Sequence, residues 1–251
     1  MYSDLPGHIL VPLLLLSACS VKEDREACPC NLFLGIKDLP VSPVVVEVTD
    51  GDFAFTRLVH ADTVLAVEVP KGELTVSVVG GALADPGGGV RIPPGEEAPP
   101  LYLFHAVVPA DSEEVFFPIR LLKQFCTLEL FFTGPFGYGP PFEVEVTGNA
   151  GGWNRDGSPA EGAFSKRLLP GSDGRAVLRL PRQGDDSLLM HIVFSDRVIR
   201  TFALGTYISE SGYDWTAPEL EDLTLKVDIS LTAVTISGDR WTATEEIDLW
   251  I

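Results

Sequence analysis

Positive charge is scarce in this sequence of 251 residues. It has 18 lysine and arginine residues against 36 aspartate and glutamate residues, which gives a net charge of −18 at pH 7. Phosphate backbones and anionic lipid headgroups repel so acidic a chain, so the composition argues against nucleic acid as a partner. It suits a soluble, extracytoplasmic body that carries its acids on the solvated faces of the fold.

Motifs that carry catalysis or bind metals are lacking. The sequence has no GxSxG, HExxH or P-loop motif and no CxxC pair, and its four histidines are scattered. Neighbouring acids such as Glu113 and Glu114 would point to opposite faces of a strand, so they do not form a catalytic carboxylate pair. We therefore predict no catalytic residue, no metal site and no cofactor.

The apolar run near the N-terminus is short. Residues 9–16 are apolar, whereas a membrane span needs about 20 apolar residues, so this run suits the core of a secretory signal. It ends in Leu16-Ser17-Ala18-Cys19, which resembles a bacterial lipobox. That resemblance implies a signal peptide at 1–18 and a lipid on Cys19; the alternative is an ordinary signal with an accidental cysteine. The first eight residues carry no lysine or arginine, although such a region is normally positive, so we expect the true start codon to lie elsewhere or the signal to be weak.

A charged tract follows Cys19. Residues 20–26 read SVKEDRE, and we expect 19–29 to form a solvated, acidic tether. The tract resembles the export signal of surface lipoproteins of Bacteroidota, in which acids just after the lipidated cysteine direct the protein to the outer face. The residues that would form this export tract are Ser20, Lys22, Glu23 and Asp24. The alternative is a plain charged linker.

Three further cysteines are Cys28, Cys30 and Cys126. On an extended backbone Cys28 and Cys30 lie on one face, where a bond between them would be strained. Either could pair with Cys126 in an oxidising compartment, closing a loop of about 100 residues worth up to about 4–5 kcal/mol. The alternative is buried free thiols within strands.

Alternation of apolar and polar residues predicts an all-β body. No stretch has the period of a long helix, and turn signals recur every 8–12 residues or so, which is typical of β-sandwiches. Asp50-Gly51 between apolar runs predicts a hairpin, and a second hairpin closes the chain around 237–240. Two blocks of strands predict two sandwiches in tandem, 30–123 and 124–251, with a Gly/Pro-rich loop at about 85–100. The candidate strands include 32–36, 44–48, 64–69, 74–79, 101–108, 115–122, 126–132, 142–146, 176–180, 188–194, 223–231 and the closing pair 234–236 and 241–251.

The N-terminal motifs together resemble a known family. The lipobox, the tract after it, Cys28-Pro29-Cys30 and the strand that follows are similar to the fimbrillin-associated anchor lipoproteins of Bacteroidota, the base subunits of type V pili. The resemblance implies two transthyretin-like β-sandwiches and a non-catalytic protein on the cell surface. Its partners would be fimbrial shaft or accessory subunits and, through the lipid on Cys19, the outer membrane. Its role would be to anchor the shaft and to help set its length.

The resemblance also implies assembly by strand complementation. In related shaft subunits proteolysis frees a groove, which a terminal strand of the neighbour fills. An anchor cannot lose its N-terminus without losing its lipid, so we expect this chain to keep the strand at 32–36. It would then engage the shaft through its C-terminal strand, around Ile247, Leu249 and Ile251. The alternative is that the closing hairpin simply completes the second sandwich.

Two other functions compete with anchoring. A surface glycan-binding lipoprotein of a polysaccharide-uptake system would expose coplanar tryptophans. A lipoprotein enzyme is disfavoured by the missing motifs. The tryptophans to compare are Trp153, Trp215, Trp241 and Trp250.

Overall fold

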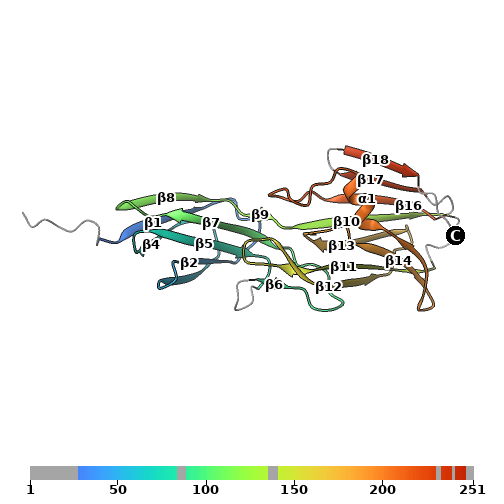
Figure 1. Cartoon of the computed structure of the whole chain (residues 1–251), viewed down its shortest axis with the longest axis horizontal. Helices are drawn as coiled ribbons and strands as arrows, with labels where there is room; N and C mark the ends of the chain where they lie inside the picture. The colour runs from blue at the N-terminus through green and yellow to red at the C-terminus, as the bar shows by residue number, and fades with distance from the viewer. Residues whose placement is uncertain (1–27, 84–88, 135–140, 230–232, 239–240, 247–251) are drawn as a thin grey trace, which may run out of the picture.

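The computed structural model describes residues 28–83, 89–134, 141–229, 233–238 and 241–246. Figure 1 shows an elongated molecule in which two β-sandwiches lie end to end, with β1 near one end and β14 near the other. Among the described residues no helix is long and apolar enough to cross a membrane. The predicted all-β class and sandwich fold are confirmed.

The N-terminal sandwich packs a three-stranded sheet, named here the β1 sheet, against a five-stranded one, the β2 sheet. The order in the β1 sheet is β4 (Thr63–Val69), β1 (Cys30–Ile36), β8 (Glu114–Ile119). The order in the β2 sheet is β3 (Ala54–Val59), β2 (Val44–Thr49), β5 (Glu73–Gly80), β7 (Tyr102–Pro109), β9 (Leu122–Lys123).

The C-terminal sandwich has the same two-layer plan. The order in its β10 sheet is β13 (Arg175–Pro181), β10 (Phe125–Thr133), β16 (Leu223–Asp228), β17 (Ala233–Gly238), β18 (Trp241–Glu246). The order in its β11 sheet is β12 (Pro159–Leu168), β11 (Glu143–Trp153), β14 (Leu189–Phe194), β15 (Arg197–Phe202), and β6 (Val90–Arg91) also pairs with β11. One short helix, α1 (Leu204–Glu210), follows β15.

Both predicted hairpins form. β2 and β3 pair antiparallel, and between them Gly51 has a φ of 102°, which a residue with a Cβ rarely adopts. Asp50 fixes this turn, because its carboxylate accepts the backbone N–H groups of Asp52 and Phe53 at 3.0 and 2.6 Å. β17 and β18 form the closing hairpin as an antiparallel pair at the end of the β10 sheet.

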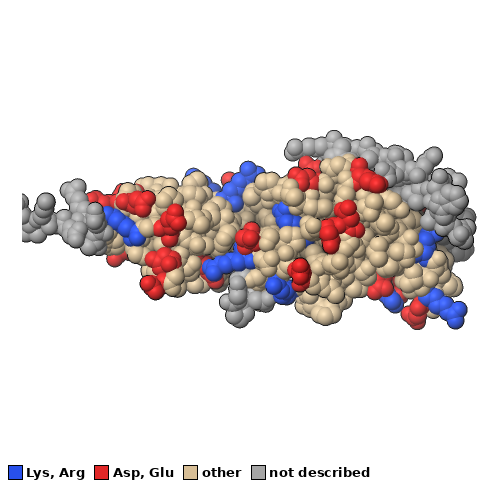
Figure 2. Space-filling model, viewed as in Figure 1, with Lys and Arg blue, Asp and Glu red and all other residues tan. Residues whose placement is uncertain are grey.

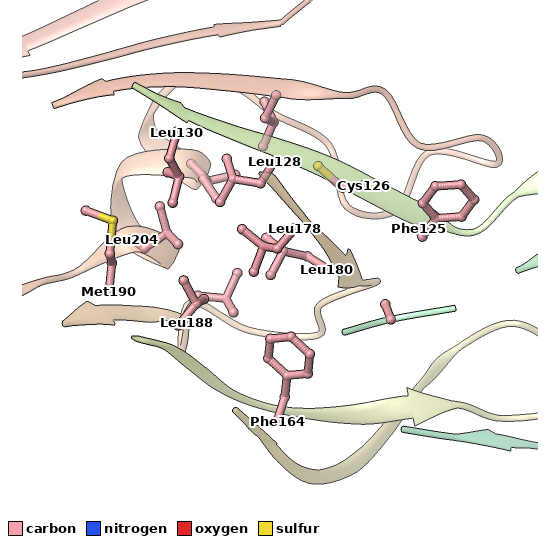
Figure 3. Packing of buried hydrophobic residues seen from close by; sticks show 14 of the residues in the cluster. Phe125, Cys126, Leu128, Leu130, Phe164, Leu178, Leu180, Leu188, Met190 and Leu204 are labelled. Carbon is pink, nitrogen blue, oxygen red and sulfur yellow. The ribbon is translucent and has the colours of Figure 1, made fainter. Parts of the chain in front are cut away.

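Each sandwich has its own hydrophobic cluster. The first draws on residues between Cys30 and Ile119, and the second on residues between Val79 and Val227. Figure 3 shows the second, in which Leu128 on β10 and Leu178 on the neighbouring strand β13 lie on one side of the cluster and Phe164 on β12, from the other sheet, lies on the opposite side. These positions alternate with exposed ones because successive strand residues point to opposite faces.

The loop expected at about 85–100 contributes to the second cluster. Its described part, here called the strap (residues 89–101), leaves the β2 sheet after β5 and packs on the C-terminal sandwich. Val90, Ile92 and Ala98 are buried there, and the N–H of Ala98 donates to the carbonyl of Arg179 in β13 at 3.1 Å. The domain bounds 30–123 and 124–251 stay a prediction, since residues of the first block also fill the second core.

Candidate functional site

The predicted lipid site lies outside the described residues. This holds for Cys19 and for the export tract Ser20, Lys22, Glu23 and Asp24. The structure does describe where the chain joins the fold: Cys30, 11 positions after Cys19 (30 − 19), is the first residue of β1. Eleven extended residues span at most about 40 Å, so the first sandwich would stay close to any lipid on Cys19.

β1 is the central strand of its sheet. It pairs antiparallel with β4 from Cys30↔Val69 to Ile36↔Thr63, and parallel with β8 from Asn31↔Glu114 to Ile36↔Ile119. Its inner side chains, Cys30, Leu32, Leu34 and Ile36, are at most 1% exposed. Removing β1 would therefore open the core and leave two unpaired strand edges.

The structure does not form the disulfide considered for Cys28, Cys30 and Cys126, since all three are free thiols. Cys30 lies in the first cluster and Cys126 in the second, so the two sulfurs belong to different cores. In this structure Cys30 and Cys126 are buried free thiols, whereas Cys28 is half-buried. Burial raises the pKa of the Cys126 thiol to about 12, which keeps it protonated and unreactive.

The junction between the sandwiches is held by a polar row on the outer face of the β2 sheet. Glu47, Ser77 and His105 lie side by side on β2, β5 and β7. Arg155, from the turn between β11 and β12, donates to Glu47 at 2.9 Å and to Ser77 at 3.5 Å. Ser77 Oγ and His105 Nδ1 are 2.7 Å apart.

This row is not a catalytic constellation. Ser77 is 1% exposed, so its hydroxyl is not accessible as a nucleophile, and the imidazole beside it has both the Arg155 guanidinium and the Asp156 carboxylate as charged neighbours. Burial first, and then Arg155, lowers the pKa of His105 below its ordinary value of 6.5, so the imidazole is neutral at pH 7. No pattern in the sequence identified these residues, because their partners come from opposite halves of the chain.

A cavity of about 650 Å³ lies beside this junction. Strands β7 and β9 of the first sandwich line one side, and loops of the second line the other, including Asp156, Arg182, Asp185 and Trp215. Its size and its place between two sandwiches are typical of ligand sites.

The charged side chains that line the cavity differ in how many hydrogen bonds they make to other groups of the protein. Arg182 is 8% exposed, and its guanidinium donates to Ala217 O and Gln124 Oε1, both at 2.9 Å, and to Trp215 O. Hydrogen bonds from Ser158 lower the pKa of Asp156, and hydrogen bonds from Ser187 lower that of Asp185. The cavity wall therefore exposes the carboxylates of Asp156 and Asp185 to a ligand, whereas the guanidinium of Arg182 is already hydrogen-bonded to backbone and amide oxygens. No group of three or more potential metal ligands occurs in the part of the chain that the structure describes.

The tryptophans do not form an exposed platform within the described side chains. Trp153 is fully buried and donates its indole N–H to Gln124 O at 2.9 Å, and Trp215 is 9% exposed. The side chains of Trp241 and Trp250 lie outside the described part of the structure, as do Ile247, Leu249 and Ile251 of the predicted strand donor. On the face in Figure 2, acidic and basic side chains are interspersed over both sandwiches.

The sheet topology defines the structural class of this protein. It is an all-β protein of two sandwiches, and its N-terminal strand β1 is part of the first core. No protein-family model matches the chain, and no curated protein matches it in sequence. Solved structures from Bacteroidota match in fold. A Bacteroides thetaiotaomicron protein described as polysaccharide-binding matches with a TM-score of 0.63 and 13% identity, over 87% of this chain and 98% of that one.

The fimbrial anchor protein Mfa2 of Porphyromonas gingivalis matches with a TM-score of 0.60 and 14% identity, over 86% of this chain and 99% of that one. A candidate adhesin of Bacteroides thetaiotaomicron matches with a TM-score of 0.56 and 14% identity, over 86% and 98%. The resemblance to fimbrial anchors inferred from the N-terminal motifs is thus confirmed in the fold. At these identities the likeness is one of architecture over nearly the whole length of each protein.

Proposed function

We propose that the chain is a non-catalytic surface lipoprotein that holds the base of a fimbrial shaft at the outer membrane. The observation that carries the proposal is the position of β1. The strand that would follow the lipid tether is the central, doubly paired strand of the first sandwich. Support also comes from the fold shared with a fimbrial anchor and from the lipobox at Cys19.

This geometry suits a protein that bears load. A pull on the tether acts along β1, because the tether would join the strand at its first residue, Cys30. The pull then loads the ladder hydrogen bonds to β4 and β8 together rather than one after another. The polar row around Arg155 and the strap connect the first sandwich to the second, so the force passes on along the molecule.

The first test compares wild type with Cys19→Ala in the bacterium that carries the gene. We expect wild type to fractionate with the outer membrane and to be cut by protease added to whole cells, whereas Cys19→Ala is released in soluble form. Equal behaviour of the two would refute lipid anchoring. Cys28→Ala, which changes a cysteine beyond the lipobox, is the matched control and should behave as wild type.

The second test concerns the shaft. A strain that lacks the gene should shed its fimbriae, and the shed fibres should be longer, since a base subunit that ends the polymer also limits its length. Deleting 245–251 should leave a membrane-bound protein that no longer retains fimbriae, if the C-terminal strand completes a shaft subunit. Normal retention in that deletion would show that this hairpin only completes the second sandwich.

Glycan binding is the second candidate, and the cavity between the sandwiches is the observation in its favour. Carboxylates beside an apolar wall can accept hydrogen bonds from sugar hydroxyls. Titrating the purified chain with neutral oligosaccharides, with Asp156→Asn as the control, tests it. The buried positions of Trp153 and Trp215 argue against the stacking platform that this function predicted.

A further inference from the structure

The cavity beside the junction adjoins a second hollow. The first hollow has a volume of about 650 Å³ and the second of about 590 Å³, and they share the lining residues Pro159, Gly184 and Asp185. We call the two hollows together the junction groove. Each hollow alone has the volume of a small-molecule site, so the junction groove is large enough for a ligand of more than one chemical unit.

Carboxylates line both hollows of the junction groove. Asp156, Asp185 and Asp186 line the first hollow, Glu161 and Asp185 line the second, and all four residues are exposed. Oδ1 of Asp156 and Oδ1 of Asp185 each accept the backbone N–H of the serine two positions later, at 2.9 and 3.0 Å. Hydrogen bonds from the hydroxyl and then from the N–H of that serine lower the pKa of each carboxyl, so both are ionised at pH 7. A carboxylate accepts up to about four hydrogen bonds, so both keep acceptor capacity for a ligand.

Positive charge that could neutralise these carboxylates is scarce in the junction groove. Among the lining residues that the structure describes, Arg182 and His105 are the only basic ones. Arg182 is 8% exposed and donates its hydrogen bonds to backbone and amide oxygens. Burial lowers the pKa of His105, so its imidazole is neutral at pH 7. The ion pairs within the described part of the chain all involve other acids, which leaves the groove carboxylates for a cation from outside the protein.

Two buried side chains in the wall of the first hollow lack hydrogen-bond partners. Trp215 is 9% exposed and Gln183 is 3% exposed, and both line this hollow. Within the described structure the indole N–H of Trp215 has no acceptor and Oε1 of Gln183 has no donor. Buried polar groups are normally paired, so these two atoms indicate a ligand that carries both donors and acceptors, as hydroxyl and amino groups do.

The cation that suits the junction groove is organic. The described acids do not include a group of three that could hold a metal ion. Leu103, Leu122 and Pro218 add an apolar wall to the first hollow, against which the carbon frame of a ligand can pack. An amine on a carbon frame matches both the carboxylates and this wall.

We propose that the junction groove binds an organic ammonium ligand, whose charged group is held at the carboxylates of Asp156 and Asp185 and whose carbon frame lies along the apolar wall. Charge-assisted hydrogen bonds from ammonium to carboxylate supply the specificity. A polyamine and an oligosaccharide of amino sugars both carry this chemistry. The inference goes beyond the proposed anchoring function, because it adds a ligand site that retention of a shaft does not require.

The test is calorimetric titration of the purified full chain, carrying Cys19→Ala so that no lipid is attached. The probes are spermidine, a trimer of glucosamine, and the N-acetylated form of the same trimer, which has no charge. We expect at least one of the two amines to bind, the N-acetylated trimer not to bind, and the affinity to fall as salt is added.

Single substitutions locate the site. Asp156→Asn and Asp185→Asn should each weaken binding of the amine about tenfold, which corresponds to about 1.4 kcal/mol. Asparagine keeps an acceptor oxygen for the serine N–H, so both variants should fold as wild type. The matched control is Asp52→Asn, because Asp52 is exposed in the turn between β2 and β3 and lines neither hollow. It changes the net charge equally and should bind as wild type.

Each outcome decides the proposal. Binding of spermidine alone assigns the junction groove to polyamines, and binding of the glucosamine trimer alone assigns it to amino sugars. Equal binding of the N-acetylated trimer, no binding of either amine, or full affinity in both groove variants would overturn the proposal. Cells that express Asp156→Asn should retain their fimbriae, so failure of the ligand site leaves the anchoring function standing, and loss of anchoring leaves the calorimetry unchanged.

Discussion

Truncating Leu34 to alanine should remove about 3 kcal/mol from the free energy of unfolding of the N-terminal sandwich. Leu34 is 0% exposed on β1, and its neighbours across the sheet are Leu65 on β4 and Phe117 on β8. The loss combines the transfer of the removed atoms to water with the cavity left in a core that strands on both sides hold in place.

Urea unfolding of purified residues 20–251 measures this loss. With a slope of about 2 kcal/mol per M, the midpoint of the first sandwich should fall by about 1.5 M. Trp153 and Trp215 both belong to the second cluster, so tryptophan fluorescence follows mainly the second sandwich, while circular dichroism follows both. We expect the transition of the first sandwich to move and the fluorescence transition to move less.

Gly35→Ala is the matched control on the same strand. A Cβ at Gly35 would meet only Phe117 O at 3.8 Å and Pro118 Cα at 4.0 Å, which are ordinary contacts. This substitution should change the midpoint little. A loss below about 1 kcal/mol for Leu34→Ala, or equal losses for the two variants, would contradict the conclusion that the inner face of β1 is core.

The remaining predictions concern the junction and the thiols. Arg155→Ala removes a positive neighbour of His105, so the lowered pKa of His105 should rise toward 6.5, which a proton NMR titration of its ring would show. The folded state disfavours protonated His105, so the free energy of unfolding should fall as the pH drops below about 7 and through the folded-state pKa. Urea unfolding at several pH values measures this, and His105→Gln should make the free energy of unfolding depend less on pH. The thiol of Cys126, with its pKa raised to about 12, should not react with iodoacetamide at about pH 8 until the chain unfolds. Half-buried Cys28 should react in the folded protein, and mass spectrometry of labelled peptides tests both expectations.

Some of the strands with alternating apolar and polar residues could be predicted from the sequence to within one or two residues at each end. The expected strand 32–36 is β1 from Cys30 to Ile36, and 74–79 is β5 from Glu73 to Gly80. Such strands have one buried and one solvated face, so the side-chain pattern reports burial directly. Hairpins were predictable for a similar reason, since their turn residues adopt backbone angles that few other residues tolerate.

The segment at 153–171 is polar and Gly-rich and has no clear alternation in the sequence, so no strand is predicted there. It contains β12, whose pairing with β11 shifts register twice. Gly151 and Gly162 pack backbone against backbone, where a Cβ on Gly151 would lie 3.0 Å from Gly162 Cα. Bulges and close glycines interrupt the alternation on which a sequence-based prediction depends.

The burial of the strap also could not be predicted from local sequence patterns, because it depends on residues far away in the chain. Its Gly/Pro-rich composition indicates a surface loop, yet Val90, Ile92 and Ala98 are buried against the second sandwich. Their partners are dozens of residues away, and no local pattern marks them. Val198 and Ile199 on β15 show the opposite case, because their apolar side chains suit a core and yet are 55% and 62% exposed.

The sequence by itself predicted a lipobox at Cys19 and a tether after it, which stay predictions, and it determined a body of alternating strands that must bury one face. Only the tertiary structure decided what covers each face: that Cys30 and Cys126 enter different cores, that Arg155 joins Glu47 on the other sandwich, and that β15 pairs only with β14 among the described strands. The physical reason is that alternation specifies which side of a strand is apolar, whereas burial depends on surfaces supplied by distant parts of the chain.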